Sequence, residues 1–169
     1  MIAVLQKLDQ FGRNLMPLAS TLLLVLLTMV PVVLPGFTAI MPAWGLMAVY
    51  YWVVFRPDLL PTSAAFAIGL LQDLLSGTPL GMNALVFVVV HWIVLTQRRF
   101  FVSTSFVVLW SGFALVVLIA MSVSWLSYSV LSLTLAPLDA ALFQALLSLT
   151  VFPVVAVLFI RLHRAFLPA

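Results

Sequence analysis

The sequence predicts an all-α membrane protein, a single bundle of six transmembrane helices that occupies residues 1–169. Two observations predict this class. Hydrophobic residues make up 66% of the chain and charged residues only 7%, whereas a soluble domain needs about 25% charged residues to keep its surface in water. The few charged residues also separate long apolar segments, and the chain has room for about six spans of ~20 residues.

The first two helices are predicted within the uncharged stretch from Asn14 to Phe55, which is too long for one span. The sequence PVVLPGF at residues 31–37 divides this stretch. Proline lacks a backbone donor and glycine adopts the left-handed conformation that ends helices, so both residues mark a break. We therefore expect helices over residues 15–34 and 39–55.

The third and fourth helices are predicted on either side of a short turn. The third helix follows the sequence FRPDLLP and is expected over residues 60–76. In the turn SGTPLG, Gly77 suits the C′ position of that helix, while Thr78 suits the N-cap and Pro79 the first position of the next helix. The fourth helix is then expected over residues 79–97, where the sequence QRRFF ends it.

The stretch from Phe100 to Leu138 could hold one long helix or two short ones, and the basic residues decide between them. With one helix over residues 103–130 and a last helix over 139–161, the chain crosses the membrane six times and all seven basic residues share one side. Basic residues concentrate in cytoplasmic loops, so both termini are predicted to be cytoplasmic. Because the basic residues lie at segment ends, we interpret them as charges that set the membrane topology rather than as a nucleic-acid-binding surface. These residues are Lys7, Arg13, Arg56, Arg98, Arg99, Arg161 and Arg164.

The first predicted helix resembles a signal peptide because basic residues precede it. Its apolar run is longer than the core of about 7–15 residues that signal peptides have, and no Ala-x-Ala cleavage site follows it. We therefore expect the first helix to be retained as a span.

Asp73 is a carboxylate within the otherwise apolar third helix. It is expected about 5 Å below the outer end of its helix, and Asn83 about 6 Å into the next helix. A carboxylate is favoured beside a helix N-terminus, so we expect Asp73 to reach toward Asn83. Ala65, Gly69 and Asp73 recur at every fourth position, which allows close packing of a neighbouring helix. A structural staple, a contact with a partner or ligand, and a proton or ion site remain open as roles for Asp73.

Few residues could support catalysis. Asp73 and His91 are the only ionisable residues within the predicted apolar spans, and they differ by roughly 13 Å in depth. The sequence has no cysteine, no paired carboxylates, no metal-binding motif and no phosphate-binding glycine loop. We therefore expect no enzymatic activity, no cofactor and no metal, with His91 hydrogen-bonded inside the bundle. The serines over residues 122–132 are expected to bond backbone carbonyls rather than to line a channel.

The sequence GLLQDLLSGTPLGMNAL, at residues 69–85, resembles the bacterial rod shape-determining protein MreD family. It is similar to that family's signature G-x-x-x-D-x-x-[ST]-x-x-P-x-G. The preceding PAWGLMAVYYWVVFRPDLLP is similar to the family's aromatic second helix. The resemblance is specific over residues 40–90 and rests on hydropathy elsewhere. The signature falls on Gly69, Asp73, Ser76, Pro79 and Gly81, and Gly77 and Asn83 complete the same hairpin.

This resemblance implies a non-enzymatic scaffold subunit of the bacterial cell-elongation complex, located in the cytoplasmic (inner) membrane among its lipids. It implies MreC as a partner and, through MreC, MreB filaments, the RodA glycosyltransferase and a class B penicillin-binding protein. It also implies a fold similar to the substrate-binding component of energy-coupling-factor transporters. No catalytic role comes with the signature residues.

An alternative function is that of a vitamin-binding membrane subunit of an energy-coupled importer, because that class shares the expected fold. Such a subunit needs polar groups and aromatic stacking partners around a cavity near the outer face. The candidates for these roles are Trp44, Asp73, Asn83, Trp125 and Tyr128.

Overall fold

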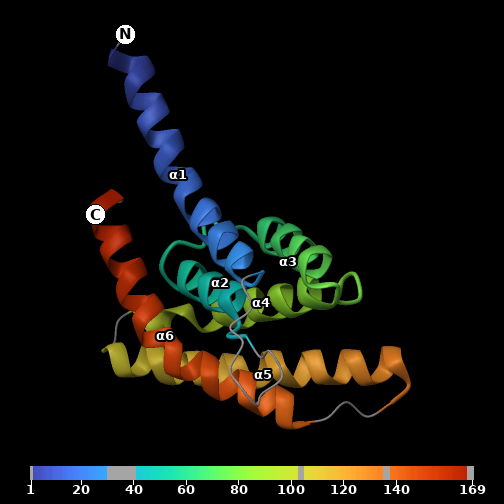
Figure 1. The fold of residues 1–169 in the computed structure, drawn as a ribbon. Coiled ribbons are helices and arrows are strands. Elements are labelled where there is room, and N and C mark those ends of the chain that lie inside the picture. The colour runs from blue at the N-terminus through green and yellow to red at the C-terminus, as the bar shows by residue number, and fades with distance from the viewer. Residues whose placement is uncertain (1, 30–40, 103–104, 135–137, 167–169) are drawn as a thin grey trace.

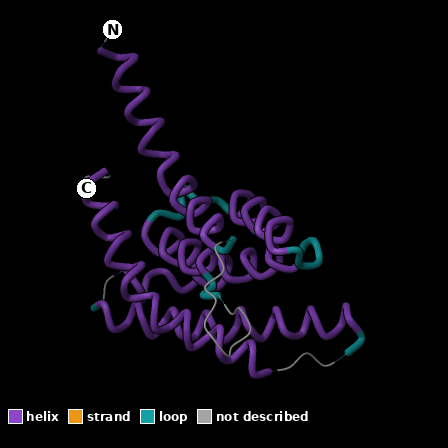
Figure 2. The backbone as a smooth tube through the Cα atoms, viewed as in Figure 1, coloured by secondary structure: helices purple, strands orange, loops and turns teal. Residues whose placement is uncertain are grey.

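The computed structural model describes residues 2–29, 41–102, 105–134 and 138–166, and the described chain is helical apart from short turns (Figures 1 and 2). The all-α class predicted from the sequence is confirmed. One helix fills the stretch for which the sequence left one or two helices open. The helices in the described chain are α1 Ile2–Leu27, α2 Trp44–Phe55, α3 Thr62–Ser76, α4 Met82–Val102, α5 Phe106–Ser132 and α6 Leu138–Phe166.

The ends of α1 differ from the predicted range of 15–34. The helix begins at Ile2, because no proline interrupts the polar segment before the apolar run. It ends at Leu27, after which the N–H groups of Thr28 and Met29 bond to carbonyls three residues earlier, as in a tight turn. The break predicted at residues 31–37 lies outside the described residues.

The other helix ends differ less. α2 begins at Trp44 rather than at 39, directly after a turn in which the Trp44 N–H donates to the Pro42 carbonyl at 2.8 Å. α4 and α6 continue past their predicted ends at 97 and 161. Both extensions contain arginine, a residue that favours helices wherever its charge reaches water.

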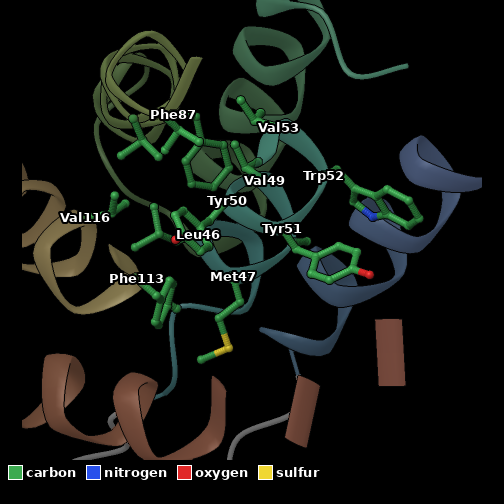
Figure 3. Close-up of a cluster of buried hydrophobic side chains, with 14 of the residues drawn as sticks. Leu46, Met47, Val49, Tyr50, Tyr51, Trp52, Val53, Phe87, Phe113 and Val116 are labelled. Atoms are coloured by element: carbon green, nitrogen blue, oxygen red, sulfur yellow. The ribbon is translucent and has the colours of Figure 1, made fainter. Parts of the chain in front are cut away.

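The centre of the molecule is α2, in which every residue of the range 45–54 is buried. An apolar helix with no polar face is expected to be enclosed on all sides. The Tyr50 ring contacts Phe113 and Phe152, with ring centroids 5.3 and 5.7 Å away (Figure 3). Its hydroxyl donates to the Leu109 carbonyl at 2.9 Å. Aromatic packing from α5 and α6 therefore fixes α2 without exposing a polar atom.

α3 and α4 pack side by side as a hairpin, and this contact is the most extensive between any two helices (Figure 1). Ala65 and Gly69 on α3 are buried in it. A Cβ atom at Gly69 would overlap the Cα and the amide nitrogen of Ala84 on α4. The small-residue face predicted from the sequence is thus the face that lets the two backbones meet.

α5 and α6 are joined by an indole hydrogen bond that a proline makes possible. Pro153 lies inside α6 and lacks an N–H, so the Leu149 carbonyl four residues earlier has no helical donor. The Trp110 indole Nε1 on α5 donates to that carbonyl at 3.1 Å. α6 also changes direction along its length (Figure 1), as expected of a helix with an internal proline.

Within the described residues, α5 and the stretch of α6 up to Arg164 are long and apolar enough to cross a membrane. α2 and α3 have 12 and 15 residues, or about 18 and 22 Å at 1.5 Å per residue. A hydrocarbon core is about 30 Å thick. These two helices are therefore shorter than independent spans, and α2 is shielded by its neighbours instead.

Candidate functional site

The turn between α3 and α4 is organised by a buried carboxylate. Asp73 is only 1% exposed. Its Oδ1 accepts hydrogen bonds from the Thr78 hydroxyl at 2.8 Å, the Asn83 backbone N–H at 2.9 Å and the Asn83 side-chain amide at 2.8 Å. Its Oδ2 accepts the Gly81 N–H at 2.9 Å. These four donors offset the cost of removing a carboxylate from water.

Asp73 supplies from α3 the cap that α4 does not carry itself. α4 begins at Met82, so the Gly81 and Asn83 N–H groups belong to its first turn and lack helical acceptors. An N-cap side chain normally satisfies such groups, but Gly81 has none. The Asp73 carboxylate takes both N–H groups and also faces the positive end of the helix dipole. The predicted contact between Asp73 and Asn83 is therefore present.

The predicted start of the fourth helix is wrong. Thr78 does not cap α4 but donates its hydroxyl to Asp73. Pro79 lies in the turn, where its carbonyl accepts the Met82 N–H at 3.2 Å. The reason is Gly81, whose φ of 95° breaks the helix between Pro79 and Met82. Gly77, with φ 67°, ends α3 in the left-handed conformation predicted for it.

His91 lies on α4, away from this turn, and is also hydrogen-bonded. Its Nε2 is 3.0 Å from the Leu60 carbonyl and its Nδ1 is 3.2 Å from the Thr62 hydroxyl. A carbonyl only accepts, so Nε2 carries a hydrogen, and in the neutral ring Nδ1 then accepts from the Thr62 hydroxyl. Thr62 and Asp73 stand at the two ends of α3, about 16 Å apart along its axis. His91 therefore joins the start of α3 to α4 and forms no relay with Asp73.

The basic residues predicted to set topology lie at or near the C-terminal ends of α2, α4 and α6, except for Lys7 and Arg13, which lie within α1. Arg98 donates from Nε to the Val54 carbonyl at 3.0 Å, near the end of α2, where a cation is favoured by the helix dipole. Arg56 is the C-cap of α2. Arg99, Arg161 and Arg164 are exposed on α4 and α6. The side chains of Lys7 and Arg13 lie outside the described residues.

The serines over residues 122–132 bond as the sequence predicted at two positions. Ser122 donates to the Leu118 carbonyl at 2.8 Å and Ser132 to the Tyr128 carbonyl at 2.7 Å. Ser148 on α6 does more, because its hydroxyl accepts the buried Ala43 N–H at 2.9 Å just before α2. Ser148 was not predicted from the sequence, because α6 also carries Gln144 and Thr150 nearby and nothing in their spacing distinguishes the serine.

A cavity of about 710 Å³ opens beside the Asp73 turn, and residues of α3, α4, α5 and α6 contribute to its walls together with residues just after α1 and just before α2. Trp125 and Tyr128 line it, as the importer alternative requires, but Trp44, Asp73 and Asn83 do not. Ser76 lines the cavity as well. The polar residues Gln72 and Gln144, which were not predicted from the sequence, also line it. Among the described residues, no group of three His, Cys, Asp or Glu could hold a metal ion.

Comparisons with known proteins identify a family. The family model described as rod shape-determining protein MreD matches residues 9–165 of this chain. The rod shape-determining protein MreD of Haemophilus influenzae is 39% identical over 51 residues, a stretch that covers 30% of this chain and 32% of that relative. No solved structure matches the chain significantly. The expected likeness to the energy-coupling-factor fold therefore stays a prediction.

Proposed function

The chain belongs to the rod shape-determining protein MreD family, and from that membership we propose that it is a non-enzymatic scaffold subunit of the bacterial cell-elongation complex. The match of the family model over residues 9–165 carries this proposal, because it spans nearly the whole chain. The geometry of the Asp73 turn supports it, since the carboxylate is fully engaged in hydrogen bonds that hold two helices together. The alternative of an importer subunit finds no support in the family match.

The proposed location is the cytoplasmic (inner) membrane, with six crossings and both termini in the cytoplasm. Two long apolar helices, α5 and α6, support membrane insertion. Both termini lie toward one side of the molecule, and the α3–α4 turn and the C-terminal end of α5 lie toward the opposite side (Figure 1). This arrangement agrees with the side that the basic residues assign to the cytoplasm.

The proposed partner is MreC, through which the scaffold would be linked to MreB, RodA and a class B penicillin-binding protein and so to peptidoglycan synthesis. Lipid-facing surface is abundant for such contacts. Leu118, Leu126, Val130 and Leu131 on α5 are all more than half exposed. In a membrane, helices associate through packing and interhelical hydrogen bonds rather than through a hydrophobic drive, so a scaffold needs no polar docking site.

Co-purification tests this function. We expect MreC to co-purify in a mild detergent with the tagged chain and not with a polytopic membrane protein that carries the same tag. In the strain with the tagged chain and in the strain with the tagged control protein, the membrane fraction must contain equal amounts of MreC and of the tagged protein. Repeated failure to recover MreC under those conditions would contradict the scaffold function. As a second measurement, expression of the chain should restore rod shape to cells depleted of their own family member.

A further inference from the structure

Basic side chains from three helices meet at the C-terminal end of α2. Arg56 is the C-cap of α2, and Arg98 on α4 donates to the Val54 carbonyl two residues earlier at 3.0 Å. On α6, the His163 ring stacks on Trp52 of α2, with the ring centroids 5.9 Å apart. Three segments that are far apart in the sequence therefore surround the last turn of one helix.

Aromatic packing fixes the position of α6 at this end. The His163 ring also meets Phe55 of α2 edge-on, with the centroids 6.2 Å apart. Trp52 is fully buried, and its indole donates to the Ser20 hydroxyl on α1 at 2.9 Å (Figure 3). These contacts hold His163 close enough to Arg56 for the charges of the two groups to interact. The basic end of α6 is thus tied to the end of α2.

The positive charge at this end exceeds the negative charge available to offset it. Among the described side chains, Asp58 is the carboxylate at this end, and it is exposed. A helix C-terminus is equivalent to roughly half a negative charge, so the ends of α2, α4 and α6 together with Asp58 leave about one to two positive charges over. The charges counted here are those of Arg56, Arg98, Arg161 and Arg164, hereafter the arginine cluster.

The cluster is built from arginine, which suits a phosphate. A guanidinium group is planar and binds phosphate oxygens through two parallel hydrogen bonds, whereas lysine acts as a point charge. The single lysine of the sequence, Lys7, lies instead within α1. Basic sites between transmembrane helices on the cytoplasmic side bind anionic lipid head groups. The chemistry of the cluster therefore matches a phosphate group with one or two negative charges.

An apolar stripe on α6 leads to the cluster and indicates a lipid. Val154, Val157, Arg161 and Arg164 follow one another at intervals of three and four residues, so they share one face of the helix. Val154 is 71% exposed and Val157 is 46% exposed. A phospholipid presents hydrocarbon and then phosphate in the same order along the membrane normal. An acidic protein segment in the cytoplasm would meet the arginines but not the valines.

We propose that the arginine cluster binds the phosphate of an anionic phospholipid in the cytoplasmic leaflet, with an acyl chain against the stripe of Val154 and Val157. Arg161 and Arg164 contact the phosphate from α6 and Arg56 contacts it from α2, while Arg98 holds the end of α2 in place. This inference rests on the membrane orientation in the proposed function but on no protein partner.

Native mass spectrometry of the full chain in detergent tests the class of lipid. The delipidated protein is incubated with phosphatidylglycerol or with phosphatidylcholine at the same concentration. We expect it to retain phosphatidylglycerol in preference, because the ammonium group of phosphatidylcholine already neutralises its phosphate. Equal retention of the two lipids would overturn the proposal.

A free anion is distinguished from a lipid by competition. Inorganic phosphate in excess should not displace phosphatidylglycerol, because it has no acyl chain to cover the valine stripe. Complete displacement by phosphate would overturn the assignment of a lipid as the ligand.

Matched variants locate the site. Arg161→Gln/Arg164→Gln removes two charges at exposed positions. It should weaken phosphatidylglycerol binding by about fivefold per charge, because a basic residue contributes roughly 1 kcal/mol at an anionic surface. Lys7→Gln/Arg13→Gln removes the same charge from α1 and should leave binding unchanged. Equal losses in the two double variants would show a general effect of net charge and would overturn the site.

Arg56 tests whether the site includes α2. Arg56→Gln should weaken phosphatidylglycerol binding, and Arg56→Lys should weaken it less, because lysine keeps the charge but not the planar group. Circular dichroism and gel filtration identify a variant that fails to fold, in which case the exposed pair on α6 decides the test. Binding that is unchanged in folded Arg56→Gln would remove α2 from the site. These measurements need no MreC, so loss of MreC co-purification with intact lipid selectivity would contradict only the scaffold function.

Discussion

At the scale of single residues, Asp73 shows how a charged side chain can be structural in an apolar protein. Its two oxygens have different partners: Oδ1 accepts three hydrogen bonds, from Thr78 and from two groups of Asn83, and Oδ2 accepts one, from the Gly81 N–H. Asparagine has one side-chain carbonyl oxygen, so at this position it can accept hydrogen bonds either from the three donors to Oδ1 or from the Gly81 N–H, but not from both. Its amide nitrogen would face either the Gly81 N–H or the three donors on the other side.

We therefore expect Asp73→Asn to lower the free energy of unfolding by about 1–3 kcal/mol, the cost of one unsatisfied buried donor. Asp73→Leu leaves all four donors without an acceptor and should cost more, to the point of poor expression. Melting temperatures of the purified variants in detergent measure both effects. Asp139→Asn is the control, because Asp139 is exposed and its carboxylate accepts the neighbouring Ala140 N–H at 2.9 Å. Equal losses for Asn and Leu would instead indicate a role for the charge.

Gly69 and Gly77 offer a second comparison, because replacing each of them with alanine should destabilise the protein for a different physical reason. Gly69→Ala places a Cβ against the Ala84 backbone and should cost about 1–3 kcal/mol or more, as overpacking does. Gly77→Ala meets open space and strains only the positive φ, for about 1–2 kcal/mol. Ala84→Gly should not rescue Gly69→Ala, because the collision is with backbone atoms. Rescue measured by thermal unfolding would contradict this account of the contact.

At this scale the sequence predicted the contact between Asp73 and Asn83, because rise per residue and helix polarity are regular enough to place both. It did not predict the role of Thr78, since Gly81 takes a positive φ that the sequence permits but does not require. Gln72 was missed because one amide in an apolar helix has no spacing that distinguishes a cavity wall from lipid-facing surface.

At the scale of elements, the packing of α5 against α6 depends on the Leu149 carbonyl, which has no helical donor because Pro153 lacks an N–H. Trp110→Phe removes the indole donor from the Leu149 carbonyl. Inside a membrane no water replaces it, so we expect a loss of about 1 kcal/mol in unfolding free energy. The double variant Trp110→Phe/Pro153→Ala restores a backbone N–H for that carbonyl and should recover most of the loss.

Trp92→Phe is the matched control for this pair, because Trp92 is 70% exposed on α4 and lies on another element. Thermal unfolding of the single and double variants gives the coupling between positions 110 and 153. Additive effects of the two substitutions would show that the indole and the missing amide do not share the Leu149 carbonyl.

Helix ends were predicted less well than helices. Positions of proline, glycine and charge gave the number of helices in the described chain. They did not reveal that polar residues extend α1 to Ile2, because an amphipathic or polar extension of an apolar helix carries no break signal. The burial of α2 on all faces agrees with its lack of a polar side, a feature that is visible in the sequence.

At the scale of the whole molecule, the proposed orientation can be tested with single cysteines, because the natural chain has none. Asp58→Cys lies between α2 and α3 and Thr134→Cys follows α5, and both positions are exposed. We expect a membrane-impermeant maleimide to label Thr134→Cys in spheroplasts and Asp58→Cys only after lysis. Labelling of Asp58→Cys in intact spheroplasts would overturn the cytoplasmic location of that loop.

The cap that Asp73 provides has a consequence for how the chain is made. The N-terminal turn of α4 has no acceptor of its own, so it becomes satisfied only when the end of α3 is already beside it. A ribosome delivers α3 first and α4 second, and the insertion machinery would release the two as a pair rather than one at a time. The carboxylate that looks out of place in the finished protein is then what keeps the second helix of the pair from entering lipid alone.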